Sequence, residues 1–166
     1  TYRPNLNQLR RAADLMAASE RPLLLAGGGV ISSDASRELR RLAHDFSIPV
    51  TSTLMGLGAF AGDDSLFLGM LGMHGTYAAN KAVNKADLII AAGARFDDRV
   101  TGRLATFAPK AKIIHIDIDP TSIRKNVEVD VPVVGDCAMS LDGLHEVLRA
   151  RDAEHPHDWA ASHAEW

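Results

Sequence analysis

Short runs of consecutive apolar residues, separated by helical patterns, constrain the fold of this chain more than any other feature. The runs do not alternate apolar with polar residues, which is typical of parallel strands that are buried on both faces. They are Leu23–Ala26, Ile48–Thr53, Asp87–Gly93, Lys112–Ile118 and Val131–Val134, with Phe67–Leu71 a candidate for a sixth. The sequence therefore predicts five or six short strands.

Helix signals lie between these runs. Each predicted helix begins near a residue whose side chain can accept hydrogen bonds from the free N–H groups of a first turn, or near a proline at the first position. The expected starts are Asn5 or Asn7, Ser33 or Asp34, Thr76, Asp119 before Pro120, and Asp136. This alternation predicts an α/β fold of three layers, in which helices cover both faces of a mostly parallel, Rossmann-like sheet of five or six strands.

The length of 166 residues fits one domain, which we expect to span residues 1–150. Residues 151–166 are polar and rich in His and Ala, and we expect them to form a linker or tail toward a missing C-terminal domain. Because the chain also begins without an initiator Met, we expect it to be one domain of a longer protein.

Charge and the lengths of the apolar runs exclude several classes of protein. A net charge of −3 gives no electrostatic footprint for nucleic acid. The apolar runs are far too short to cross a bilayer, and no signal segment opens the chain. The single cysteine, Cys137, forms no intramolecular disulfide, which suits a reducing compartment. We therefore expect a cytoplasmic protein without nucleic-acid or membrane partners.

Glycine-rich or charged clusters follow the predicted strands. They are Gly27–Gly29, Leu71–Thr76, Gly93–Arg99 and Asp117–Asp119. In open parallel sheets, ligands bind outside the carboxyl ends of the strands, near the point where strand order reverses, so this coincidence predicts a ligand site. The glycine triplet alone is ambiguous. It lacks the third glycine of the dinucleotide fingerprint and equally suits a tight turn into a helix.

Individual side chains in these clusters suggest a phosphorylated ligand. Arg95 or Arg99 could bind a phosphate through two hydrogen bonds, although a solvated loop with local ion pairs explains them as well. Asp117 ends an apolar strand, where a carboxylate needs a partner and could accept hydrogen bonds from ribose hydroxyls. Asp119 is explained more simply as the N-cap of the next helix, and Asp136 suits either role.

Neither a hydrolytic site nor a metal site is expected. The histidines lack the spacing of metal ligands, and Cys137 has no second thiol, so it fits a small core residue or a residue at a helix start. These histidines are His115, His145, His155, His157 and His163.

Four segments, in this order along the chain, resemble the large catalytic subunit of acetolactate synthase, also called acetohydroxyacid synthase. The most specific is Gly93-Ala-Arg-Phe-Asp-Asp-Arg-Val-Thr-Gly102, in which Ala94 replaces a more common Val. The others are Pro22-Leu-Leu-Leu-Ala-Gly-Gly-Gly29, Leu71-Gly-Met-His-Gly-Thr76 and His115-Ile-Asp-Ile-Asp119. The resemblance extends from about Tyr2 to Arg149.

This resemblance implies a central domain with a DHS-like NAD/FAD-binding fold that holds FAD. The parent enzymes are transferases whose two outer domains bind thiamine diphosphate and Mg²⁺. They decarboxylate pyruvate and join the two-carbon fragment to pyruvate or 2-oxobutyrate in branched-chain amino acid biosynthesis. The implied partners are the two outer domains, a homodimer or tetramer of the parent, and a regulatory small subunit.

The resemblance also assigns roles by position. Asp117 and Asp136 are expected at the adenosine half of FAD, and the loops after Leu71 and Gly93 at the ribityl and flavin half. The implied FAD contacts are Gly27, Gly28, Gly29, Thr53, Leu54, Leu71, Gly72, Met73, His74, Gly93, Ala94, Arg95, Phe96, Asp97, Arg99, Asp117, Ile118, Asp136 and Cys137. Met73, Asp98 and Arg99 match positions beside the substrate channel, where inhibitors bind.

We expect no catalysis by the chain alone, because it has no Gly-Asp-Gly followed by a metal-binding Asn segment. A family contact to FAD also comes from an Arg upstream of this domain. Two alternatives stay open. The chain could be a structural or assembly module whose site is empty or holds ADP, from a related enzyme such as glyoxylate carboligase. It could also be a nicotinamide-binding oxidoreductase domain, which the absent third glycine disfavours.

Overall fold

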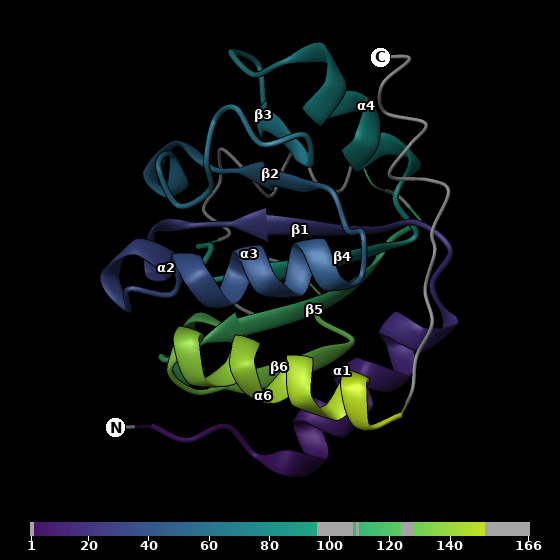
Figure 1. Ribbon diagram of the computed structural model, residues 1–166, viewed down its shortest axis with the longest axis vertical. Helices are drawn as coiled ribbons and strands as arrows, with labels where there is room; N and C mark the ends of the chain where they lie inside the picture. Colours follow the sequence, from purple (N-terminus) through teal and green to yellow (C-terminus); the bar gives the residue numbers. More distant parts are fainter. Residues whose placement is uncertain (1, 96–107, 109, 124–127, 152–166) are drawn as a thin grey trace.

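Six parallel strands form one sheet, in the order β3-β2-β1-β4-β5-β6 (Figure 1). The computed structural model describes residues 2–95, 108, 110–123 and 128–151. The strands are β1 (Pro22–Ala26), β2 (Val50–Ser52), β3 (Phe67–Met70), β4 (Leu88–Ala92), β5 (Lys112–Asp117) and β6 (Val131–Val134). Every pairing among them is parallel. The predicted parallel α/β sheet is confirmed, and the candidate strand near Phe67 is its sixth member.

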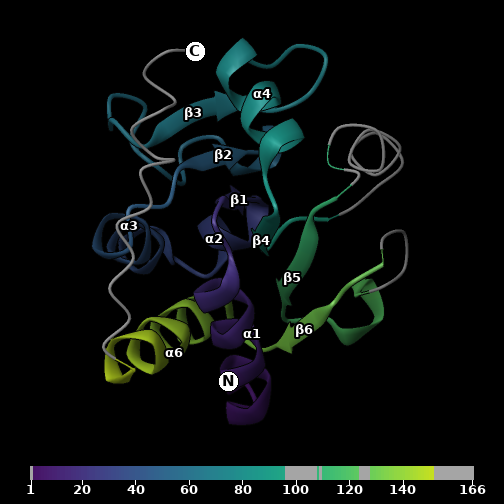
Figure 2. The same ribbon diagram turned by 90° about the vertical axis from the view of Figure 1, so that its right-hand side faces the viewer.

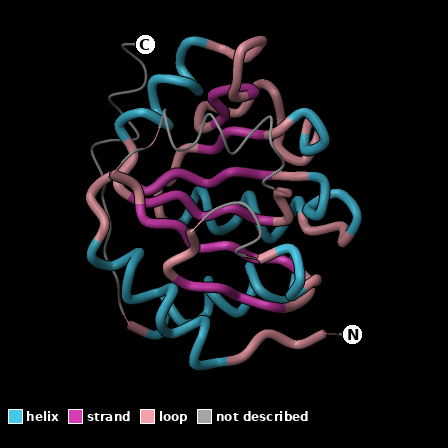
Figure 3. Tube along the Cα trace, turned by 180° about the vertical axis from the view of Figure 1, so that it is seen from behind, coloured by secondary structure: helices cyan, strands magenta, loops and turns pink. Residues whose placement is uncertain are grey.

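Helices cover both faces of this sheet, which gives the predicted three layers (Figures 1 and 2). On one face lie α1 (Leu6–Ala18), α3 (Ser36–Asp45) and α6 (Cys137–Ala150), and on the other lies α4 (Tyr77–Lys85). Three shorter elements, α2 (Gly28–Ser32), η1 (Leu54–Gly56) and η2 (Pro120–Ser122), are each separated from the preceding strand by one or two residues. Figure 3 shows the strands from behind as one continuous layer.

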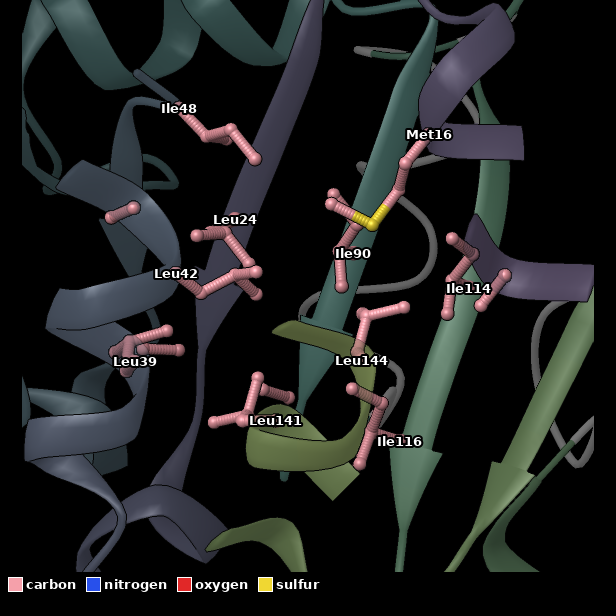
Figure 4. Packing of buried hydrophobic residues seen from close by; sticks show 14 of the residues in the cluster. Met16, Leu24, Leu39, Leu42, Ile48, Ile90, Ile114, Ile116, Leu141 and Leu144 are labelled. Carbon is pink, nitrogen blue, oxygen red and sulfur yellow. The ribbon is translucent and has the colours of Figure 1, made fainter. Parts of the chain in front are cut away.

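The continuous apolar strands are explained by this layering, because successive strand residues point to opposite faces and both faces are buried. In β1, Leu24 belongs to the apolar cluster under α1, α3 and α6, whereas Leu23 and Leu25 belong to the cluster under α4. Figure 4 shows the first cluster, in which Leu42 of α3 and Leu144 of α6 lie over the strands.

Most predicted helix starts are confirmed. Asn5 accepts hydrogen bonds from Asn7 N and Gln8 N, Thr76 accepts one from Ala79 N, and Asp136 accepts one from Met139 N. These caps satisfy donors that have no partner within the helix.

The predicted N-cap at Ser33 or Asp34 is wrong. The helix begins at Ser36 after Ala35, because the unpredicted helix α2 occupies Gly28–Ser32 and ends in these residues. The Ser33 hydroxyl donates to the Gly29 carbonyl of that helix, and Asp34 has a φ of 53°, which turns the chain toward α3.

At the amino edge of the sheet, Asp87 joins the start of β4 to the turn before β1. Its carboxylate accepts hydrogen bonds from Ser19 Oγ, Glu20 N (2.8 Å) and Arg21 N (2.9 Å). Burial raises the pKa of Asp87, but these hydrogen bonds outweigh that effect and hold the pKa below its usual value of 3.8.

The Asp87 carboxylate is expected to make stability depend on pH. Because its folded-state pKa is depressed, the carboxylate stabilises the fold above the unfolded pKa, and this contribution is lost as pH falls through the folded pKa. We expect Asp87→Asn to lower the free energy of unfolding at neutral pH by about 1 kcal/mol, since partial exposure screens the charge. Urea denaturation between about pH 2 and pH 7 measures both effects. An equal acid dependence in Asp87→Asn and in the exposed control Asp63→Asn would contradict this role.

Candidate functional site

The strand order reverses at the carboxyl edge of the sheet, between β1 and β4. From β1 the chain adds β2 and β3 on one side, then returns to add β4, β5 and β6 on the other. Open parallel sheets bind their ligands at such a point. The arrowheads of β1 and β5 in Figure 1 point to this edge, where α2 also lies.

A row of backbone hydrogen bonds continues along this edge beyond the strands, so each turn is fixed to the end of its neighbour. The bonds are Leu71 N to Ser52 O (3.1 Å), Thr53 N to Ala26 O (3.0 Å), Gly27 N to Ala92 O (2.9 Å), Gly29 N to Gly93 O (3.0 Å), Gly93 N to Ile116 O (2.9 Å) and Gly135 N to Asp117 O (3.0 Å). The edge is therefore held in place by main-chain atoms.

The turns after β1 and β4 touch through their backbones. A Cβ added at Gly27 would lie 2.4 Å from the Cα of Ala94, and one added at Gly29 would lie 2.7 Å from the Cα of Gly93. Gly93 has a φ of 60°, and a Cβ there would lie 2.5 Å from the Cα of Gly29. No side chain fits between the two turns. Contact between the turns thus explains these glycines, whether or not a ligand is bound.

The loop after β3 is fixed by two polar side chains of the helix that follows it. Asn80 accepts from Gly72 N (2.9 Å) and donates to Gly72 O (2.8 Å), and the Thr76 hydroxyl donates to the Leu68 carbonyl. Between these fixed points, Met73 and His74 are exposed, with Met73 71% exposed. The loop therefore presents both side chains to solvent from a fixed backbone.

Asp117 ends β5 as a half-buried carboxylate. Its Oδ1 accepts from Asp119 N (2.9 Å), and its Oδ2 lies 3.6 Å from His115 Nε2. Burial raises the pKa of Asp117, but the nearby His115 side chain and the hydrogen bond from Asp119 N outweigh that effect, so the pKa lies below its usual value. The carboxylate is ionised at neutral pH, and Oδ2 keeps capacity to accept a hydrogen bond from a hydroxyl.

Asp119 and Asp136 both serve as helix caps. Asp119 accepts from Thr121 N (2.9 Å) at the start of η2, as predicted, and Asp136 accepts from Met139 N (3.0 Å) at the start of α6. Cys137, the first residue of α6, is buried in the apolar cluster, and burial raises the pKa of its thiol to about 12. The prediction of a small core residue or a residue at a helix start is confirmed for Cys137, and its thiol is protonated at neutral pH.

The structure brings the predicted ligand residues that it describes to this one edge. After β1 to β6 in turn they are Gly27, Gly28 and Gly29; Thr53 and Leu54; Leu71, Gly72, Met73 and His74; Gly93, Ala94 and Arg95; Asp117 and Ile118; and Asp136 and Cys137. The side chains of Leu71, Ala94 and Cys137 are buried in the core, so these residues offer a ligand their backbone atoms. Phe96, Asp97, Asp98 and Arg99 lie outside the described residues.

Three further residues at this edge were not singled out as ligand or support residues from the sequence. Met55 of η1 is 76% exposed and lies against Gly28, where an added Cβ would be 3.2 Å from the Met55 Cβ. Asn80 fixes Gly72, and His115 contacts Ala94. A histidine inside an apolar strand signals a need for a buried partner, whereas the roles of Met55 and Asn80 depend on contacts that no local pattern reveals.

Within residues 2–95, 108, 110–123 and 128–151, no group of three or more His, Cys, Asp or Glu side chains is arranged to hold a metal ion. In the same part of the chain, no helix is both long enough and apolar enough to cross a membrane.

Comparison with known proteins assigns the domain. The profile of the family described as "Thiamine pyrophosphate enzyme, central domain" matches residues 9–144. The chain belongs to this family. The fold predicted for such a central domain is the one observed, with its six parallel strands between helices.

The relatives of this central domain include several acetolactate synthase large subunits. It is 57% identical over 152 residues to a probable acetolactate synthase large subunit of Methanocaldococcus jannaschii, covering 92% of this chain and 26% of the relative. It is 55% identical over 143 residues to the acetolactate synthase large subunit of Parasynechococcus marenigrum, covering 86% of this chain and 23% of the relative. It is 44% identical over 167 residues to the acetolactate synthase large subunit of Buchnera aphidicola subsp. Schizaphis graminum, covering 100% of this chain and 29% of the relative. The resemblance expected from the sequence is confirmed, and this chain spans about a quarter of these relatives.

The contact between the two glycine turns predicts a severe effect of a single methyl group. We expect Gly27→Ala to lower the free energy of unfolding by about 3 kcal/mol or more, because its Cβ would meet main-chain atoms that have no room to move. At Gly62 an added Cβ has no atom within 4 Å, so Gly62→Ala should change stability by no more than about 0.5 kcal/mol. Guanidinium denaturation compares the two variants, and similar stabilities would contradict the contact.

The Asn80 clamp predicts a local effect on the loop after β3. Asn80→Ala should lower the free energy of unfolding by about 1–2 kcal/mol, because both backbone groups of Gly72 lose their partner. It should also speed hydrogen exchange at the Gly72 amide. Asn84→Ala, an exposed position of the same helix, is the matched control. Unchanged exchange at Gly72 in Asn80→Ala would show that the clamp does not hold the loop.

Proposed function

We propose that this central domain binds FAD along the carboxyl edge of its sheet. The observation that carries the proposal is the distribution of side chains along that edge. An ionised carboxylate, Asp117, lies after β5, and exposed apolar side chains, Leu54 and Met73, lie after β2 and β3 at the other end. A ribose and a flat apolar ring system are the chemical groups that suit these two ends.

The dimensions of the edge support a dinucleotide over a single nucleotide. Four inter-strand intervals separate β5 from β3 in the strand order. At about 4.8 Å for each interval, the edge between them measures roughly 19 Å, which is comparable with the length of an extended flavin dinucleotide. The glycine turns lie midway, where the absence of side chains leaves main-chain atoms accessible to a pyrophosphate.

Within this arrangement we assign the adenosine half to the end at β5 and β6. Asp117 Oδ2 would accept a ribose hydroxyl, and Ile118, which is 53% exposed, offers apolar surface beside it. The ribityl and flavin half is assigned to the loops after β3 and β4. When bound, FAD would supply an isoalloxazine ring there. In line with the sequence resemblance, we propose that this ring has no net part in the main reaction.

The topology argues against a nicotinamide-binding oxidoreductase. In dinucleotide folds of that type, the acidic residue that binds ribose follows the second strand, about 20 residues after the glycine turn. Here β2 ends in Ser52 and is followed by Thr53, and the ionised carboxylate lies at the end of β5 instead. An ADP site would use the β5 end alone and would leave the exposed apolar side chains after β2 and β3 without a role.

For the longer protein we propose acetolactate synthase activity, in which pyruvate is decarboxylated and its two-carbon fragment is joined to a second 2-keto acid. The similarity to acetolactate synthase large subunits supports this proposal. Thiamine diphosphate and Mg²⁺ would bind to the two outer domains, which are not part of this chain. The outer domains, a dimeric or tetrameric parent and a regulatory subunit are proposed as its partners, in the cytoplasm.

The assignment of Asp117 predicts a specific loss of affinity. Asp117→Ala should weaken FAD binding roughly ten- to a hundredfold, which corresponds to about 1.5–3 kcal/mol for a hydrogen bond to a charged group. Asp119→Ala is the matched control, because its backbone N–H can still donate to Asp117. Titrations of each folded variant with FAD, ADP and NAD measure the effect. Tight NAD binding without FAD binding would favour the oxidoreductase, and equal affinities for FAD and ADP would favour the single-nucleotide site.

The proposed location of the thiamine site in the outer domains predicts that the 166-residue chain alone is inactive. Incubation with pyruvate, thiamine diphosphate and Mg²⁺ should yield no acetolactate, because we assign the thiamine site to the outer domains. A colorimetric assay for acetoin after acidification measures the product. Turnover above that of a heat-denatured sample would overturn this assignment.

A further inference from the structure

His115 is a fully buried imidazole on β5, between the neighbouring strands β4 and β6. It lies on β5 between Ile114 and Ile116, and its ring is on the opposite face from theirs. Its Nε2 lies 2.9 Å from the Ala94 carbonyl oxygen and 3.6 Å from Asp117 Oδ2. Because a carbonyl oxygen can only accept a hydrogen bond, Nε2 carries the ring hydrogen and donates a hydrogen bond to the Ala94 carbonyl.

The two groups that this nitrogen approaches belong to different strand ends. Ala94 follows β4 and adjoins Gly93, whose backbone touches Gly29, whereas Asp117 ends β5. The bond from Gly93 N to Ile116 O joins the same strands one residue earlier, but it does not orient the Ala94 carbonyl. The His115 ring orients that carbonyl and lies beside the carboxylate.

We propose that His115 is a positioning residue, which fixes the positions of the turn after β4 and of the Asp117 carboxylate relative to each other. This proposal rests on the FAD site proposed above. In that site the pyrophosphate would lie over the turn after β4, and the adenosine ribose would lie at Asp117. His115 itself does not contact the ligand. It acts by holding the Ala94 carbonyl and by placing a polar N–H beside the carboxylate that does contact the ligand, with Nε2 3.6 Å from Oδ2.

Two substitutions of similar size separate the effect of the His115 N–H from the effect of its volume. His115→Met fills the space with an apolar side chain and removes the N–H, whereas His115→Gln supplies an N–H at about the same reach. His145→Met is the matched control. His145 is also buried and contacts a carboxylate, Asp45, at 2.6 Å, but it lies on α6, on the other face of the sheet.

Three measurements on the 166-residue chain are compared: the free energy of unfolding, the pKa of Asp117 by carbon NMR, and FAD affinity. We expect His115→Met to raise the pKa of Asp117 toward its ordinary value and to weaken FAD binding about tenfold, since the carboxylate loses the polar N–H beside it and the Ala94 carbonyl loses its hydrogen bond. His115→Gln should restore both. His145→Met should lower stability and change neither. In an Asp117→Asn background, the effect of His115→Met on FAD affinity should shrink, because the two residues act as one unit.

A purely structural His115 would give a different result. His115→Met and His145→Met would then lose similar stability, and the pKa of Asp117 would stay unchanged, which overturns the proposal. If the chain binds no FAD, the proposed function fails on its own, while the pKa of Asp117 still tests whether His115 positions the carboxylate. If His115→Met lowers FAD affinity equally in both backgrounds, Asp117 is not the group through which His115 acts.

Discussion

The contact between the backbones of two glycine turns determines the geometry of the carboxyl edge. Gly27 and Gly29 after β1 lie so close to Gly93 and Ala94 after β4 that no Cβ fits between them. These turns flank the point where the strand order reverses, so the two halves of the sheet are joined there by main-chain atoms. Backbone hydrogen bonds join the neighbouring turns to these two, and a close-packed interior leaves little room for movement, so this contact fixes their positions as well.

Two polar side chains fix the turns on either side of the glycine contact. On the β5 side, His115 binds the Ala94 carbonyl and lies beside Asp117, and on the β3 side Asn80 fixes the loop that carries Met73. Both supports are polar side chains that hydrogen-bond to backbone groups. A half-buried, ionised carboxylate at one end of the edge and exposed apolar side chains at the other are therefore presented by a backbone that hydrogen bonds hold in place. Such preorganisation would lower the cost of binding at the proposed dinucleotide site.

Much of this fold follows from the sequence, because buried parallel strands must be continuously apolar and strand ends carry the turns. The limits have physical causes. The helix α2 has no sequence signal, since five residues beginning with two glycines show no helical periodicity, and the residues that end it resemble a cap for α3. The triplet Gly27–Gly29 fits either a turn or a ligand site from sequence alone, because Gly93, which it contacts, lies more than sixty residues away. The contact of His115 likewise depends on a carbonyl that follows a different strand.

A crystal structure of the chain with FAD would locate the proposed ligand directly. We expect the dinucleotide to lie along the carboxyl edge, with its adenosine ribose at Asp117, its pyrophosphate over the turns of Gly27–Gly29 and Gly93, and its flavin beside the loop that Asn80 fixes. A dinucleotide that runs in the opposite direction, with its ribose at the end of β2, would contradict the proposed site. So would FAD density away from this edge, or movement of the two glycine turns apart to admit the ligand.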